Sequence, residues 1–259
     1  IPEDAATLII VSPRRDLLPA AAEELRRFLR DGGSLFLFVD LESGELPELG
    51  SVLADFGIAL PNGMVLEPDR TRNLGDPLAL VPEIAAHQIT DPIRDTNERV
   101  AMRLARPVQF TDRAPRAVER APLLRSSQDS LLRTELQNGA TSRIPGDIAG
   151  PHILAAAVVD SDYVSEEAIA RLLVVGDSDM LVPYDGRNLF PGNLSFVTGG
   201  LNWLRGDTQT TPIPPKYTTA APLQITGQQA LFIAVLVIVL IPAGILAIGA
   251  VVWLRRRHL

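Results

Sequence analysis

The sequence predicts an α/β domain followed by one C-terminal transmembrane helix. Two observations indicate the domain: the chain opens in the order strand, helix, strand, helix, and its apolar runs without alternation are typical of strands covered on both faces. A third observation indicates the span, because residues 230–254 contain no charged side chain. We therefore expect an α/β domain (1–206), a Pro/Thr-rich spacer (207–229), a transmembrane helix (230–254) and a short tail (255–259).

The elements of the domain follow from its apolar patterns and from its prolines and glycines. Proline suits the first turn of a helix and glycine its end, which places a helix between Pro19 and Gly32. Residues 61–150 are irregular and rich in Arg, Asp and Pro, with short apolar runs only, and support no firm assignment. We expect four parallel core strands, Thr7–Val11, Ser34–Val39, Ile153–Val159 and Arg171–Val175, and helices at Pro19–Arg30, Pro47–Phe56 and Asn193–Leu204.

The apolar segment 230–254 is long enough to cross a membrane, since a helix needs only about 20 residues to do so. The apolar segment is followed directly by Arg255, Arg256 and Arg257. The spacer before it has Lys216 as its only basic residue. Because positive charge beside a span marks the cytoplasmic side, we expect the tail inside and the domain outside. The chain begins at Ile1 and shows no signal peptide, so we expect further sequence upstream in the natural protein.

Composition excludes several classes of function. The formal net charge is −7, and the sequence has 31 acidic and 21 basic residues when the three tail arginines are left out. An acidic surface of this kind argues against a nucleic-acid partner, because a phosphate backbone requires a basic face. The sequence has no cysteine, which excludes disulfides, zinc-thiolate sites and thiol nucleophiles.

An acidic loop follows the last predicted strand, at the position where open α/β sheets bind ligands. It contains Asp177, Ser178 and Asp179, and Asp160 and Asp162 follow the neighbouring strand. Four carboxylates in one place would hold a hard cation such as calcium or magnesium. The spacing is not that of a calcium loop, so we favour aspartates that cap turns, and the metal stays unassigned.

The residues needed for known catalytic chemistries are sparse. Ser178 does not fit Gly-x-Ser-x-Gly, and His87 and His152 are the only histidines before the span. Each of these is expected to have a structural role, His87 by bonding to the backbone and His152 at the start of a strand. No phosphate-binding Gly-x-x-x-x-Gly-Lys-Ser/Thr loop occurs, and the turn at residues 12–16, with two arginines, more simply forms a solvated turn. We expect no enzyme activity and no cofactor.

Several segments together resemble a known family. They are IPEDAATLIIVSPRRDL at the start, RDGGSLFLFVD, HQIT at 87–90, PLLRSSQDS at 122–130, AGPHILAAAV, VVGDSDML, LNWLRGD and the terminal WLRRRH. In this order they resemble the GldG-like auxiliary component of ABC transporters, named for gliding motility. The resemblance extends over essentially the whole chain.

This resemblance implies a non-catalytic extracytoplasmic subunit in a bacterial inner membrane, beside a separate permease and ATPase. It implies a flavodoxin-like or class I glutamine-amidotransferase-like fold, whose usual nucleophilic cysteine is absent here. Two alternatives remain, a membrane-tethered hydrolase of a surface polymer and a scaffold for an envelope assembly. Within the predicted span, Ala243, Ala247 and Ala250 form a face of small residues, which we expect to pack against a permease helix.

Overall fold

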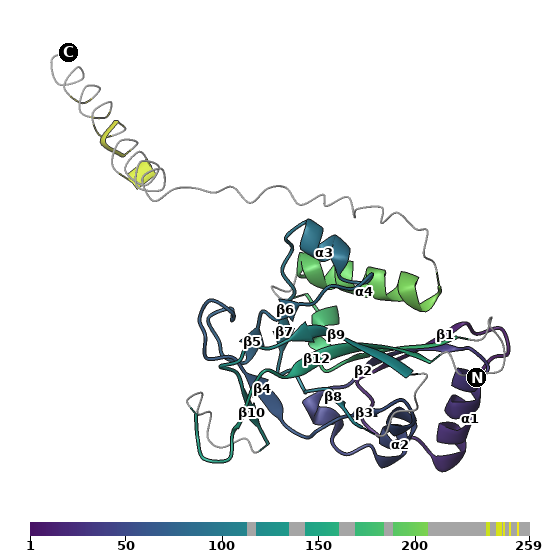
Figure 1. Ribbon diagram of the computed structural model, residues 1–259. Coiled ribbons are helices and arrows are strands. Elements are labelled where there is room, and N and C mark those ends of the chain that lie inside the picture. Colours follow the sequence, from purple (N-terminus) through teal and green to yellow (C-terminus); the bar gives the residue numbers. More distant parts are fainter. Residues whose placement is uncertain are drawn as a thin grey trace. The chain divides into compact units, whose positions relative to one another are not determined.

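The computed structural model describes residues 1–112, 118–134, 143–160, 169–183 and 189–206, together with 237, 238, 242–244, 246, 249 and 253. The chain divides into two compact units, 1–212 and 213–259. Within the described residues, the first unit is an α/β domain built on a six-stranded sheet (Figure 1). The α/β class predicted for the domain is thus confirmed.

The elements of the first unit alternate between helix and strand at both ends and consist mainly of short strands in the middle. In chain order they are β1 (Thr7–Val11), α1 (Pro19–Arg30), β2 (Ser34–Phe38), η1 (Leu41–Ser43), α2 (Pro47–Asp55), β3 (Ile58–Ala59), β4 (Met64–Leu66), β5 (Ala79–Leu80), β6 (Glu83–Ile84), α3 (Asp91–Asp95), β7 (Met102–Arg103), β8 (Gln109–Phe110), β9 (Val118–Arg125), β10 (Leu131–Arg133), β11 (Ile148–Ala149), β12 (Ile153–Asp160), β13 (Ala170–Val175), η2 (Asp179–Leu181) and α4 (Pro191–Leu204). The four predicted strands and three predicted helices are all present, with bounds within two residues of those expected.

The main sheet has the strand order β1-β2-β13-β12-β9-β6. Strands β1, β2 and β13 are parallel, as predicted. The prediction of a parallel strand at Ile153–Val159 is wrong, because β12 runs antiparallel to both β13 and β9. Its apolar sequence indicates burial on both faces and says nothing of direction. Only nine residues separate β12 from β13, whereas a crossover between parallel strands needs a dozen or more. The short connection therefore requires the two strands to be antiparallel.

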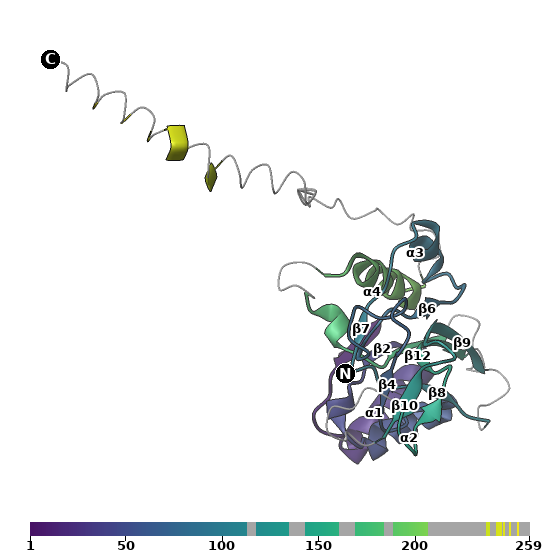
Figure 2. The same ribbon diagram turned by 90° about the vertical axis from the view of Figure 1, so that its left-hand side faces the viewer.

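Helices cover both faces of the sheet (Figures 1 and 2). On one face α1 and α2 pack against alternate residues of β2, Leu35 and Leu37. On the other face α4 contributes Phe196, which packs with Phe36 and Phe38. Successive side chains of a strand point to opposite faces, so the unalternating run SLFLF fills two separate cores.

Residues 61–150 form strands of mostly two or three residues, tied together by buried charged side chains. Arg133 and Asp147 form a buried bidentate ion pair, with Nε to Oδ1 at 2.9 Å and Nη2 to Oδ2 at 2.7 Å. Arg106 is also buried and donates to three backbone carbonyls, those of Gly44, Leu60 and Pro61, at 2.9–3.0 Å. These bonds satisfy donors that would otherwise be costly to bury.

In the described part of the chain, no helix combines the length and the apolar character that crossing a bilayer requires. Most of the predicted span (230–254) lies outside the described residues, as do the spacer (207–229) and Arg255, Arg256 and Arg257. Of the predicted packing face, Ala247 and Ala250 are outside the description. Ala243 is inside it, in helical conformation and exposed.

Candidate functional site

The candidate site lies at the carboxyl ends of β2 and β13, the two central parallel strands. The helix after β2 packs on one face of the sheet and the helix after β13 on the other, so the chain reverses its winding between these strands. Open α/β sheets bind their ligands in the crevice at such a point. The loops that follow the two strands are residues 39–46 and 176–183.

A side-chain bridge joins the two loops at this point. Asp40, two residues after the end of β2, accepts two hydrogen bonds from Ser178 in the loop after β13. The Ser178 backbone N donates to Oδ1 at 2.6 Å, and its Oγ donates to Oδ2 at 2.7 Å. Both carboxylate oxygens of Asp40 are thus engaged by the facing loop, which leaves Asp40 committed to holding the two loops together.

Asp177 occupies the same loop and is 2% exposed. Its Oδ2 accepts from the backbone N of Arg103 at 2.6 Å, and its Oδ1 accepts from the backbone N of Asp179 at 2.8 Å. Burial raises the pKa of Asp177 to about 8, against the opposing effect of these two N–H groups. The nearby charges of Asp179 and Asp40 raise it further. This carboxyl group therefore anchors β7 to the loop and is held close to its neutral form.

The structure does not bring the four predicted carboxylates together. Asp160 ends β12 and pairs with Ala170 at the start of β13, whereas Asp177 follows the far end of β13. The expectation that Asp160 lies beside the acidic loop is wrong, because β12 is antiparallel. Asp162 lies outside the described residues. Among the described residues there is no cluster of three or more acidic or histidine side chains suited to a metal ion.

Two residues of the site were not predicted from the sequence, Asp40 and Asn193. Asp40 had a usable signal, since it closely follows a buried strand, as Asp177 does. Asn193, in the first turn of α4, had none. Its buried amide exchanges two hydrogen bonds with the backbone of Ala101 at 2.8 and 2.9 Å and donates to the carbonyl of Met180 at 3.2 Å. Asn193 thereby fixes α4 to β7 and η2.

A cavity of about 420 Å³ opens beside the loop after β13 and the start of α4. Asp179 and Asp76 supply negative charge to its wall and Arg103 supplies positive charge, while Val182 and Phe190 are apolar. Of the predicted loop residues, Asp179 alone lines this cavity. The other two, Asp177 and Ser178, are engaged in the bonds between loops.

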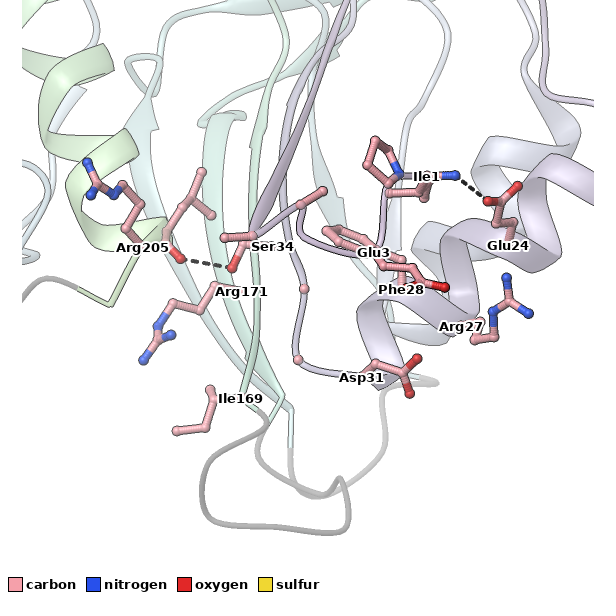
Figure 3. A pocket seen from close by; sticks show the side chains of 16 residues that line it. Ile1, Glu3, Glu24, Arg27, Phe28, Asp31, Ser34, Ile169, Arg171 and Arg205 are labelled. Atoms are coloured by element: carbon pink, nitrogen blue, oxygen red, sulfur yellow. Dashed lines mark hydrogen bonds and ion pairs between the residues drawn. The ribbon is translucent and has the colours of Figure 1, made fainter.

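A second cavity, of about 680 Å³, lies at the opposite end of the strands, next to the amino ends of β2 and β13 (Figure 3). Ser34 lines it and donates its Oγ to the carbonyl of Leu204 at 2.9 Å. Arg171 and Arg205 lie on one side and Asp31 on the other. Because both charge signs line the wall, this cavity indicates no single class of ligand.

The two histidines have the structural roles expected of them. The Nδ1 of His87 accepts from the backbone N of Ile89 at 3.2 Å, and its ring meets Trp203 edge to face. His152 directly precedes β12, and its Nε2 lies 3.2 Å from the carbonyl oxygen of Ile148. Burial lowers the pKa of both rings. In the part of the chain that is described, neither ring bonds to a serine or threonine hydroxyl, as a Ser-His pair would require.

The arginine-containing turn after β1 also serves the fold. Arg14 forms an exposed ion pair with Glu42. Asp16 caps α2, accepting from the backbone N of Glu48 at 2.7 Å and of Leu49 at 3.1 Å. Burial opposes ionisation of Asp16, but the N–H bonds prevail and lower its pKa. The N-terminal end of a helix favours a carboxylate, which explains the placement.

Comparison with known proteins identifies the fold and nothing finer. No family model matches the chain, and no curated protein matches its sequence. Among solved structures, the chain is similar to the mmIFT52 N-terminal domain, with a TM-score of 0.54 and 14% sequence identity over 77% of each chain. The likeness is one of fold. At this identity it carries no information on ligand or partner.

Proposed function

We propose that this chain is a non-catalytic auxiliary subunit of an ABC-type transport system, working with a separate permease and ATPase in a bacterial inner membrane. The domain would lie outside the cytoplasm and the predicted span would anchor it. The proposal rests on the resemblance of the sequence segments to the GldG-like component. Its finer fold assignment, flavodoxin-like or class I glutamine-amidotransferase-like, belongs to the same proposal.

The observation that carries the non-catalytic part is the bridge between Asp40 and Ser178. In an α/β enzyme the crevice between β2 and β13 would present reactive groups to a substrate. Here the groups at that position bond to each other and to backbone N–H groups at 2.6–2.8 Å. The absence of cysteine from the sequence removes the nucleophile usual in amidotransferase-like folds.

Co-purification tests the transport assignment. The full chain is expressed at its natural level with an affinity tag, extracted in mild detergent and isolated, and the proteins that accompany it are identified by mass spectrometry. We expect one permease and one ATPase subunit in constant ratio to the chain. Recovery of envelope proteins without either subunit would contradict the proposal and favour the scaffold alternative.

A paired variant tests the predicted contact of the span. Replacing Ala243 and Ala247 with leucine adds bulk to the small-residue face and keeps the segment apolar, so membrane insertion is retained. We expect the yield of permease to fall at least several-fold. The control replaces Val237 and Ile238 with leucine, which alters no small residue. Equal permease yields from both variants would show that the helix is only a tether.

A further inference from the structure

Strand β1 is an edge of the main sheet. It is the first strand in the sheet order and, within the described residues, pairs with β2 alone (Figure 1). Its sequence, TLIIV, contains no charge, proline or glycine. Ile9 is 51% exposed and Val11 is 46% exposed. Proteins usually protect such edges with charges, prolines or bulges, because an open edge recruits another strand.

The backbone of β1 directs one row of hydrogen-bonding groups outward. The carbonyl of Ala6 accepts from Ser34, and the backbone N of Ser12 donates to Phe38, so the even-numbered residues face β2. The N–H and C=O groups of Thr7, Ile9 and Val11 therefore face away from the sheet. This outward row has three residues, with Ile9 at its centre.

The exposed side chains belong to the same residues. Ile9 pairs in register with Phe36 and Val11 with Phe38, so both side chains lie on the face that α4 covers. The helix packs over β2 and β13, and the exposed fractions of Ile9 and Val11 show that its cover ends before β1. Leu8 and Ile10 pack toward the α1 face instead.

We propose that β1 pairs antiparallel with β1 of a second copy of this chain, about a two-fold axis at Ile9. This register sets Ile9 opposite Ile9 of the second copy and Thr7 opposite Val11 of the second copy. Every outward residue then exchanges two N–H···O bonds with its partner. The two sheets become one continuous sheet, and the exposed isoleucines form a cross-strand apolar pair. A two-fold contact of this kind is closed and does not propagate.

The charges that flank β1 agree with this orientation. Glu3 and Asp4 precede the strand, and Arg14 and Arg15 follow it. Antiparallel pairing brings the acidic end of one copy to the basic end of the other, whereas parallel pairing would oppose like charges. Arg15 is exposed and has no ion-pair partner within the described residues. The favoured second strand is therefore another β1 in the opposite direction.

The proposal is independent of the transport assignment and is tested by disulfide formation in the full chain, which has no natural cysteine. Hydrogen-bonded antiparallel pairs have Cα atoms about 5.5 Å apart, within the disulfide range. Ile9→Cys should form an intermolecular disulfide under mild oxidation. Val11→Cys alone should not, because the two cysteines would lie about 14 Å apart along the strands. A mixture of Thr7→Cys and Val11→Cys chains should cross-link again.

Light scattering on the detergent-solubilised full chain gives the second measurement. After subtraction of the micelle, the wild-type chain should have twice the mass of one copy, and Ile9→Lys should have half the wild-type mass. The control is Ile148→Lys, at a site that is 54% exposed on β11, and it should stay dimeric. A monomeric wild type, an Ile9→Lys chain that is still dimeric, or cross-linking of Val11→Cys to itself would each overturn the proposal.

Discussion

Asp177 illustrates how a single buried carboxyl group couples stability to pH. Its ordinary pKa is 3.8, and burial raises the pKa to about 8 in the folded chain. Because the folded chain holds this proton more tightly than the unfolded chain, the resulting stabilisation is complete below pH 3.8 and is lost as the pH rises toward 8. Asp177 thus stabilises the fold at acidic pH, whereas an ion-paired aspartate stabilises a fold at neutral pH and loses this effect in acid.

The Asp177→Asn variant should remove this pH dependence. Between pH 4 and 8 the free energy of unfolding of the wild type should fall, relative to the variant, by up to about 1.4 kcal/mol per pH unit. Chemical unfolding of the full chain across this range measures the two slopes. Asp129→Asn, at an exposed aspartate outside this loop, is the control and should follow the wild type. Parallel curves for wild type and Asp177→Asn would show that Asp177 is not protonated more readily in the fold.

At the scale of elements, the loops after β2 and β13 are held by Asp40. Removing its carboxylate by Asp40→Ala leaves the backbone N and the Oγ of Ser178 without their acceptor. Hydrogen bonds to charged groups contribute more than neutral ones, so we expect a loss of about 2 kcal/mol, or about 4–8 °C in Tm. Glu45→Ala removes an exposed carboxylate from the same loop and should leave Tm unchanged. Equal Tm values for the two variants would show that the bridge contributes nothing.

The sequence was informative about elements wherever local patterns were long. Strands of five or more apolar residues and helices opened by proline at 19, 47 and 191 were predictable to within two residues. Between residues 61 and 150, most strands have two or three residues, which is too short for any period to show. This part is held together by Arg106, Arg133 and Asp147. Charged residues are predicted to lie at the surface unless their partners are known.

The candidate site was predictable in position and not in chemistry. Strand ends followed by aspartate pointed to residues 176–179, where the loops do meet. The placement of Asp160 failed because a buried strand looks the same in either direction. That Asp177 and Asp40 bond to backbone N–H groups, in place of a cation, depends on distances between segments up to 138 residues apart. No local pattern encodes such a distance.

At the scale of the whole molecule, the arginines after the apolar segment carry the prediction of topology, and the acidity of the domain contributes little to it. Arg255, Arg256 and Arg257 form the only dense basic cluster beside the predicted span. Positive residues next to a span are retained in the cytoplasm, whereas acidic residues hinder export little. The proposed orientation therefore places the spacer and the domain outside and the last residues inside.

Single cysteines in the cysteine-free chain test this orientation in intact spheroplasts. Thr219→Cys, in the spacer, should react with a membrane-impermeant maleimide, because the proposed orientation exposes residues before Gly227 to the outer medium. His258→Cys, after the arginines, should react only once the membrane is permeabilised. Each variant thus serves as the control for the other, and the permeabilised sample shows that both thiols are reactive. Labelling of His258→Cys but not of Thr219→Cys in intact spheroplasts would reverse the topology and place the α/β domain in the cytoplasm.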